Sequence, residues 1–397
     1  MTARLRVAVC QDFREERWPS MDRVADELLA ALARDHAQTI LATPVAPPFS
    51  RRATRLATGR LAANVDRGLN RLLDYPAHVG RARDGFDIFH VIDHSYAQLV
   101  HRLPAERTIV TCHDLDTFRS ILPFGEGDAE ARSLAFRAMT RHILAGLQRA
   151  AVVTCDTQAV REQLLAAGLV SADRVRVVPV GVSRVFGPQP DAEADRRAAS
   201  VLPAAEPGTI ELLHVGSVAE RKRIDVLLAS CAEVRRKVPG LRLVRVGDPL
   251  TAAQTRTMRS LHLDSTVISI PPVDDETLAA LYRRATLLLM PSEREGFGLP
   301  VVEALACGTP VIASDLPVLR EVGGGSVDYC PVGDLGAWSR AIVALLDEQV
   351  HAPDHWATRR TQGISWARRY SWSHFADHVV SIYLDLVGLA TVSRRTA

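Results

Sequence analysis

Short apolar runs rich in Val and Ile alternate along the chain with longer stretches in which apolar residues recur at helical spacing. This alternation predicts repeated strand–helix units, which build parallel sheets covered by helices on both faces. Helices are expected from Ser20 to Ala31 and over Glu130–Arg149. The strands expected in the first half are Leu5–Cys10, Thr39–Ala42, Asp87–Ile92, Thr108–Cys112, Ala151–Thr154 and Val175–Pro179.

The pattern is interrupted once and then starts again. Residues 186–208 are rich in Gly, Pro, Ala and Asp, which is typical of a linker. We therefore predict an N-terminal domain over 1–185 and a C-terminal domain over 209–372, with a last helix over about 373–397. The strands expected in the second half are Ile210–Val215, Leu241–Val246, Val267–Ile270, Thr286–Met290 and Pro310–Ser314.

Composition narrows the class of protein. A chain of 397 residues, 47% hydrophobic and 24% charged, fits two globular domains. The formal net charge of +2 gives no sign of a nucleic-acid partner, and no apolar run approaches the length of a membrane span. We expect a cytoplasmic protein with reduced cysteines, because its six cysteines are scattered and form no C-x-x-C pair. No Cys/His spacing suggests a metal site.

Two common nucleotide-binding motifs are absent from the sequence. No G-x-G-x-x-G follows an expected strand, and no G-x-x-x-x-G-K-[ST] occurs, so neither a dinucleotide oxidoreductase nor a P-loop enzyme is favoured. In doubly wound sheets, ligands bind beyond the carboxyl ends of the strands. The residues that directly follow the expected strands are therefore the candidates for chemistry.

The segment after the strand Thr286–Met290 is the most informative in the chain. Gly296 and Gly298 allow close approach of the backbone to a ligand, and Pro300 suits the first turn of a helix expected over Leu299–Cys307. The free N–H groups and the dipole of that helix would attract an anion such as a diphosphate. Two carboxylates accompany it, Glu295 before the helix and Glu303 within it, and each can accept two hydroxyl hydrogen bonds.

This segment resembles the E-x₇-E motif of the retaining glycosyltransferases of family 4, which have the GT-B fold. The resemblance implies two facing Rossmann-like doubly wound domains with an interdomain cleft. It also implies that Glu295 contacts hydroxyls of the donor sugar and that Glu303 holds the ribose. The backbone amides that would cap sugar and phosphate oxygens are those of Phe297, Gly298 and Leu299.

A basic segment at the start of the C-terminal domain is similar to the family's diphosphate-binding motif. It runs from His214 through Gly216, and Lys222, one of only two lysines in the chain, falls at the family's lysine position. The family's usual arginine is Ser217 here, and Arg221 is a candidate replacement. Fixed cations would stabilise the departing diphosphate. The alternative for both residues is a solvated helix start.

Further candidates also follow from the resemblance. His113, after the strand Thr108–Cys112, would face the donor sugar, and the neighbouring Asp114 belongs to the acceptor side. Asp93 and His94 follow another strand and are acceptor-side candidates as well. Val273 would lie near the nucleobase; a strand end followed by a helix cap at Asp274 is an equal alternative.

Six arginines between Arg51 and Arg71 are interleaved with leucines. One interpretation is a basic amphipathic helix on the inner face of a membrane, as a lipid-linked acceptor would require. The favoured interpretation is an ordinary solvated helix face.

The sequence thus predicts a retaining glycosyltransferase that moves a sugar from a nucleotide-diphosphate sugar to a hydroxyl of a saccharide, lipid-linked or small-molecule acceptor. Neither a metal nor another cofactor is expected. Two alternatives stay open. One is a GT-B epimerase or hydrolase of sugar nucleotides, and the other is a non-catalytic nucleotide-sugar-binding subunit.

Overall fold

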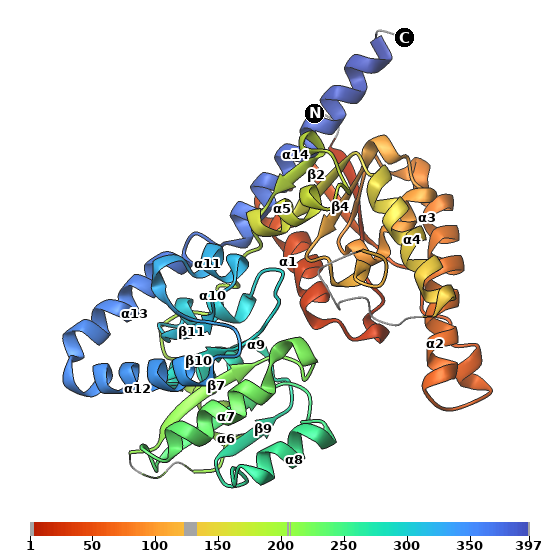
Figure 1. Ribbon diagram of the computed structural model, residues 1–397. Coiled ribbons are helices and arrows are strands. Elements are labelled where there is room, and N and C mark those ends of the chain that lie inside the picture. Colours follow the sequence, from red (N-terminus) through yellow and green to blue (C-terminus); the bar gives the residue numbers. More distant parts are fainter. Residues whose placement is uncertain (1–3, 123–132, 205, 207, 396–397) are drawn as a thin grey trace. The chain divides into compact units, whose positions relative to one another are not determined.

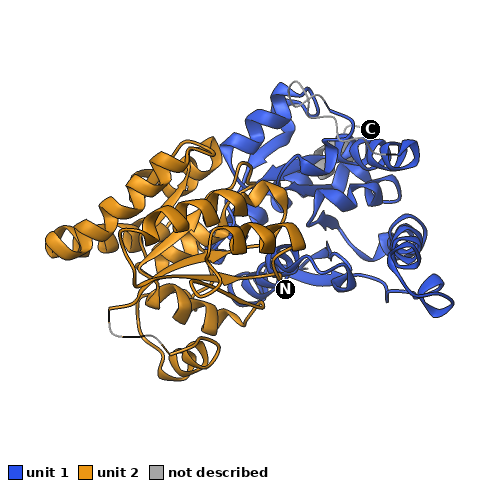
Figure 2. Ribbon diagram, turned by 60° about the horizontal axis from the view of Figure 1, so that its bottom comes forward, with its two compact units in different colours: residues 1–181, 372–397 blue, residues 182–371 orange. Residues whose placement is uncertain are grey.

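The computed structural model describes residues 4–122, 133–204, 206 and 208–395. It divides into two compact units, coloured separately in Figure 2. Unit 1 consists of Met1–Gly181 together with Trp372–Ala397, and unit 2 is Val182–Ser371. Within the described ranges, no helix combines the length and the apolar composition that a membrane crossing needs.

Unit 1 contains a six-stranded sheet in the order β2-β1-β3-β4-β5-β6, with every neighbouring pair parallel. The strands alternate with helices along the chain (Figure 1), so their carboxyl ends share one edge of the sheet. The strands are β1 (Leu5–Cys10), β2 (Ile40–Val45), β3 (Ile88–Val91), β4 (Thr108–Cys112), β5 (Val152–Cys155) and β6 (Val175–Val177).

The helices of unit 1 include one long element contributed by the end of the chain. That element, α14, packs against α1, where Ser373 accepts a hydrogen bond from Arg34. Deeper in the unit, the Tyr383 hydroxyl lies 2.8 Å from Nδ1 of His90 on β3. The helices are α1 (Pro19–Asp35), α2 (Arg60–Leu69), α3 (Tyr75–Ala82), α4 (Leu134–Arg149), α5 (Gln158–Ala166) and α14 (Trp372–Arg395), with the 3₁₀ helix η5 (His94–His101).

Unit 2 contains a second parallel six-stranded sheet, in the order β12-β11-β10-β7-β8-β9. Its central strands are apolar on both faces, as expected of a sheet covered by helices on both sides. Leu213 and Leu288 face one core, whereas Leu212 and Leu287 face the other. The strands are β7 (Ile210–Val215), β8 (Leu241–Val246), β9 (Val267–Ile270), β10 (Leu287–Met290), β11 (Val311–Ser314) and β12 (Val327–Cys330).

Eight helices of unit 2, all within the described residues, form the two covering layers. Helix α6 packs against α9 and α10 against α13, while α7 packs against α12 (Figure 1). The helices are α6 (Ala192–Ser200), α7 (Ile224–Arg235), α8 (Ala252–Ser260), α9 (Asp275–Arg284), α10 (Leu299–Ala306), α11 (Pro317–Gly323), α12 (Leu335–His351) and α13 (Pro353–Ala367).

The linker expected over residues 186–208 is not irregular throughout. Helix α6 occupies its centre, capped by the Asp191 side chain, which accepts from the N–H groups of Glu193 and Ala194. Ala194 and Ala198 are buried in the core of unit 2. The sequence pattern did not predict this helix, because its buried face consists of alanines, which give a weak apolar pattern among Asp, Glu and Arg.

The predicted fold class, two doubly wound α/β sheets, is confirmed. Five of the eleven expected strands have the predicted bounds, and the other six shift at their ends by one to three residues. The edge strand β12 was missed, because Val327-Asp-Tyr-Cys follows three glycines and is only partly apolar. Of the helix expected over Glu130–Arg149, residues 130–132 lie outside the described residues.

Two glycines in helices of unit 1 provide a matched test of packing. A Cβ added to Gly146 in α4 would lie 2.0 Å from the carbonyl oxygen of Ala97 in η5, whereas one added to Gly68 in α2 meets nothing within 4 Å. Gly146→Ala should therefore destabilise unit 1 by about 1–3 kcal/mol or more. Gly68→Ala should stabilise it by about 0.5–1 kcal/mol. Urea unfolding measures both changes; equal midpoints for the two variants would contradict the close packing of α4 on η5.

Candidate functional site

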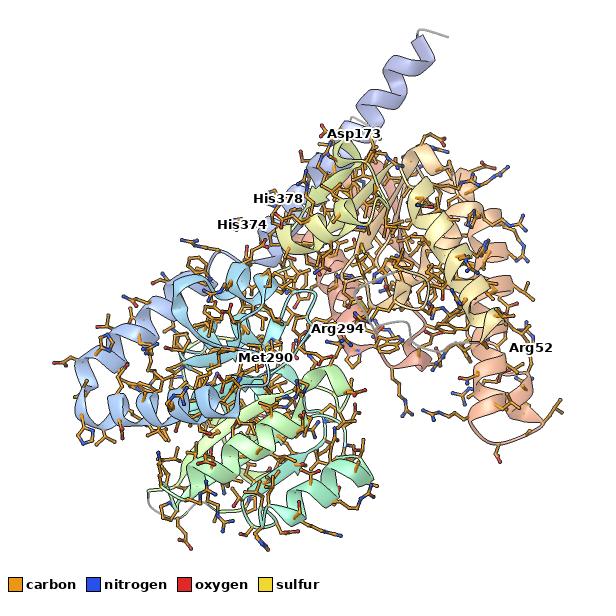
Figure 3. The ribbon with its side chains drawn as sticks, viewed as in Figure 1. Arg52, Asp173, Met290, Arg294, His374 and His378 are labelled. Carbon is orange, nitrogen blue, oxygen red and sulfur yellow. The ribbon has the colours of Figure 1, made fainter. Side chains whose placement is uncertain are left out.

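All but one of the candidate residues of unit 2 follow β7 and β10, which are adjacent strands of the sheet, and Val273 follows the edge strand β9. Figure 3 marks this place with Met290, the last residue of β10, and Arg294 in the loop that follows. The 3₁₀ turn Glu220–Lys222 approaches the same loop from the end of β7. The N–H of Glu293 donates to the carbonyl of Arg221, at 2.8 Å, and this bond ties the two loops together.

Helix α10 begins directly after this loop with an open N-terminus. Gly298 precedes it with φ of +95°, and a Cβ there would lie 2.7 Å from Cδ2 of Leu319, so the position requires glycine. Pro300 lies in the first turn, and no side chain caps the helix. Among the described residues, the N–H groups of Phe297, Gly298 and Leu299 donate to no protein acceptor. These donors and the helix dipole form a site suited to an anion.

Lys222 and Arg221 converge on Glu295. Lys222 Nζ lies 2.6 Å from Oε1 of Glu295, and an Arg221 guanidinium nitrogen lies 3.5 Å from Oε2. Arg221 also donates to the carbonyl of Arg294, at 3.1 Å. Burial pushes the pKa of Glu295 up, but the charges of Lys222 and Arg221 outweigh burial and lower it. The sequence predicted these three residues individually, and the structure brings them into one cluster.

Glu303 lies on the buried side of α10. Its side chain accepts a hydrogen bond from the Tyr282 hydroxyl of α9, at 2.8 Å, and the residue is almost fully buried. Tyr282 therefore orients the carboxylate that the resemblance assigns to the ribose. The sequence did not point to Tyr282, because a tyrosine in an apolar helix is typical of a residue of the hydrophobic core.

The turns after β7 and β8 are in direct contact. The Gly216 N–H donates to the carbonyl of Val246, at 3.0 Å, and a Cβ on Gly247 would lie 2.1 Å from the Gly216 carbonyl oxygen. The buried guanidinium of Arg245 on β8 donates to that same carbonyl oxygen, at 3.0 Å. The sequence did not point to Arg245, because β8 also carries Arg242 and the pattern does not distinguish the two arginines.

The remaining candidates of unit 2 have local partners. The Ser217 hydroxyl accepts from the N–H of Ala219, at 3.5 Å. Phe297 packs edge-on against Tyr370, with ring centroids 5.4 Å apart. Val273 is half-buried and precedes Asp274, whose side chain accepts from the Thr277 N–H and caps α9. The helix cap expected at Asp274 is confirmed, and the nucleobase role of Val273 stays a prediction.

In unit 1, His113 is held on both sides. Nδ1 lies 2.7 Å from an Asp156 carboxylate oxygen, and Nε2 lies 2.8 Å from the carbonyl oxygen of Ile92. Both partners only accept, so both ring nitrogens carry protons and the imidazole is cationic. Burial alone would lower the pKa of His113, but Asp156 and Asp93 raise it to about 9. The ring thus uses both nitrogens within unit 1.

Asp93, His94 and Asp114 lie together beside His113. The Asp93 carboxylate accepts from the N–H and the hydroxyl of Ser95 and begins η5. The ring nitrogens of His94 lie 3.3 Å from Asp93 and 3.7 Å from Asp114, with ring centroids of His94 and His113 6.5 Å apart. The four candidates of the first domain therefore form one cluster at the carboxyl ends of β3 and β4.

The arginine-rich stretch divides into two sets of residues. Arg71 points inward, where its guanidinium donates to the carbonyl and hydroxyl of Ser95 and stacks 4.0 Å above the Tyr96 ring. It also pairs with Glu16, at 3.3 Å. The solvated helix face favoured for the whole stretch is therefore wrong for Arg71. Sequence alone gave no reason to separate Arg71 from the other five arginines.

The other part of that stretch is exposed. Leu56 and Leu61 are 91% and 80% exposed, and Val65 lies one helical turn beyond Leu61 on α2. Arg52, labelled in Figure 3, pairs with Asp74. Arg51, Arg55 and Arg60 are exposed and have no ion pair among the described residues.

No group of three or more His, Cys, Asp or Glu side chains within the described ranges is arranged to hold a metal ion. All six cysteines are buried, and none of them forms a disulfide.

Two family models match this chain, one mainly over unit 1 and one within unit 2. Residues 21–185 match the family model described as Glycosyltransferase Family 4, and residues 200–360 match that of Glycosyl transferases group 1. A D-inositol 3-phosphate glycosyltransferase of Rhodococcus erythropolis is 36% identical over 199 residues, 48% of this chain and 44% of that protein. The same enzyme of Kineococcus radiotolerans is 34% identical over 239 residues, 54% of each chain. The chain spans about half the length of the curated relatives it matches.

Solved structures share the fold over almost the whole chain. Sucrose-phosphate synthase of Thermosynechococcus elongatus has a TM-score of 0.74 at 22% identity, covering 97% of this chain and 100% of that one. Anabaena HepE, solved in complex with UDP and glucose, has a TM-score of 0.71 at 16% identity, covering 96% and 100%. With the two models matching most of the sequence, one in each unit, the chain belongs to the GT-B glycosyltransferases of family 4 and group 1.

Proposed function

We propose that this protein transfers a sugar from a nucleotide-diphosphate sugar, bound by unit 2, to a hydroxyl of an acceptor. The observation that carries the proposal is the convergence of Lys222 and Arg221 on Glu295 beside the open N-terminus of α10. Cations and unpaired N–H groups suit a diphosphate, and a carboxylate beside them suits sugar hydroxyls. The solved complex of Anabaena HepE with UDP and glucose supports this class of donor.

The chemical role of the cluster follows from charge. As the glycosidic bond breaks, negative charge builds on the departing nucleoside diphosphate. Lys222 and the N–H groups at Phe297–Leu299 are fixed before the reaction, so they stabilise that charge without reorganising. We propose that the sugar keeps its anomeric configuration, with the leaving phosphate guiding the acceptor hydroxyl to the same face. In this scheme no side chain acts as a nucleophile, and the residues that hold the diphosphate do so without a metal.

Nuclear magnetic resonance of the reaction tests transfer and stereochemistry together. Wild-type protein incubated with UDP- and GDP-sugars and a panel of hydroxyl acceptors should form a product whose anomeric configuration matches that of the donor. Lys222→Met should lower kcat by two to three orders of magnitude, because it removes one cation from the leaving group. Lys237→Met, which changes the only other lysine of the chain, is the control and should leave kcat unchanged.

Each other outcome supports a different function. An inverted product would contradict the stereochemical proposal alone. Conversion of the donor without an acceptor would favour a sugar-nucleotide epimerase or hydrolase. Donor binding without turnover across the panel would favour a nucleotide-sugar-binding subunit.

We further propose that unit 1 associates with anionic membranes through the exposed part of its arginine-rich stretch. Leu56, Leu61 and Val65 are exposed apolar side chains, and the unpaired Arg51, Arg55 and Arg60 lie close to them in the sequence. An apolar row bordered by cations is the pattern of a helix that lies in a lipid interface. A lipid-linked acceptor would make such a surface useful.

Co-sedimentation with vesicles measures this association. Wild-type protein should sediment with vesicles that contain phosphatidylserine and less with neutral vesicles, and added salt should weaken binding. Leu61→Ser should reduce the bound fraction several-fold. Leu134→Ser changes a leucine of nearly equal exposure, 82% against 80%, at the start of α4, and should have no effect. Equal losses in both variants, or no binding by the wild type, would remove the membrane proposal.

A further inference from the structure

Arg245 is an arginine buried without an ion pair among the described residues. Its side chain is fully buried in β8, and its guanidinium donates only to two carbonyl oxygens, those of Asp248 at 2.6 Å and Gly216 at 3.0 Å. Its Nε has no partner, and among the described residues no carboxylate oxygen lies within 4.0 Å of it. Arginines are almost never fully buried unless they are paired. A buried arginine without an ion pair calls for an explanation.

A second buried arginine of the same strand forms an ion pair. Arg242, three residues earlier, is also buried, and it contacts the Glu211 carboxylate, which Arg284 contacts as well. Arg242 thus has an ordinary structural role. Arg245 lacks such a partner, and it lies at the end of the strand where the candidate site is found.

The position of Arg245 links it to the diphosphate-binding turn. It pairs in register with His214 of β7, and its hydrogen bond holds the carbonyl of Gly216, two residues further on. A Cβ on Gly216 would lie 3.6 Å from Cε of Lys222, so Lys222 and Arg245 flank the same glycine. His214 adds no charge, because burial and the nearby cations Arg245 and Lys222 lower its pKa well below the usual value.

The charges of this region do not balance within the protein. The cations are Arg221, Lys222 and Arg245, and two carboxylates act on them. Glu295 pairs with Lys222 and Arg221. Burial lowers the pKa of Arg245, and the charge of Asp248 opposes that shift without forming an ion pair. Three positive charges against two negative charges leave an excess of positive charge. A diphosphate that bridges a nucleoside and a sugar carries two negative charges, so this excess of positive charge favours its binding.

We propose that Arg245 is a positioning residue of the donor site, whose buried charge binds the diphosphate electrostatically through the Gly216 turn. This proposal rests on the proposed function, because it assumes that the diphosphate binds at the Gly216 turn. Arg245 stabilises the anion from behind the backbone and fixes the Gly216 carbonyl away from the phosphates.

Three variants separate the charge of Arg245 from its hydrogen bonds. Arg245→Gln keeps a hydrogen-bond donor and removes the charge, Arg245→Lys keeps the charge, and Arg242→Gln is the matched control on the same strand. Calorimetric titration with UDP, GDP, uridine and guanosine gives the ratio of diphosphate to nucleoside affinity in each variant. This ratio is independent of the fraction of protein that is folded, so partial unfolding of a variant does not obscure the result.

In Arg245→Gln, we expect the affinity for the diphosphate to fall at least tenfold and that for the nucleoside by less than twofold. Arg245→Lys should retain the wild-type ratio within a few-fold, and Arg242→Gln should leave it unchanged. Equal ratios in Arg245→Gln and wild type would overturn the proposal while leaving the donor site intact. Equal loss in the Gln and Lys variants would also overturn it, since hydrogen bonding alone would then explain the residue. If the wild type binds no diphosphate, the donor-site proposal fails and that for Arg245 fails with it.

Discussion

The ion pair between Lys222 and Glu295 is the interaction on which the site in unit 2 depends. It joins the turn after β7 to the loop after β10, and both partners are nearly buried. A buried pair is costly to desolvate and is retained only where further contacts compensate. Here those contacts come from Arg221, which bonds the carbonyl of Arg294, and from the N–H of Glu293, which bonds Arg221 in return. The pair therefore fixes two loops that parallel strands bring to one edge of the sheet.

The two units carry different electrostatics at the carboxyl ends of their strands. In unit 2 cations outnumber the carboxylate they face, and the helix N-terminus of α10 adds unpaired donors. In unit 1 the cationic His113 pairs with Asp156 and lies near Asp93, while Asp93 and Asp114 flank His94. Arg71 is partly neutralised by Glu16. An anionic donor is therefore expected to bind to unit 2. The residues of unit 1 are better suited to hydroxyl groups, because carboxylates readily accept hydrogen bonds from hydroxyls.

Much of this architecture could be predicted from sequence, because both faces of each sheet are buried and the strands read as apolar runs. Glu295 and Glu303 could be recognised because Gly298 and Pro300 mark the helix start between them. The roles of Arg71 and Arg245 could not be recognised from sequence, because the burial of a single arginine depends on long-range packing that no local pattern encodes. Helix α6 was missed because alanines form its buried face, and β12 because an edge strand needs few apolar residues. The contacts of Glu303 with Tyr282 likewise appear only when α9 and α10 are packed together.

The central claim is that unit 2 binds a nucleoside diphosphate whose ribose contacts Glu303. Thermal unfolding with nucleoside diphosphates tests this claim most directly. One nucleoside diphosphate from a panel, present at a hundred times its dissociation constant, should stabilise the wild type by about 2.7 kcal/mol. Glu303→Ala should lose that stabilisation, and Glu233→Ala, which changes an exposed glutamate of α7, should keep it. The account would be contradicted if the nucleotide stabilised the Glu303→Ala variant as much as the wild type. It would also be contradicted if no nucleotide of the panel stabilised the wild type.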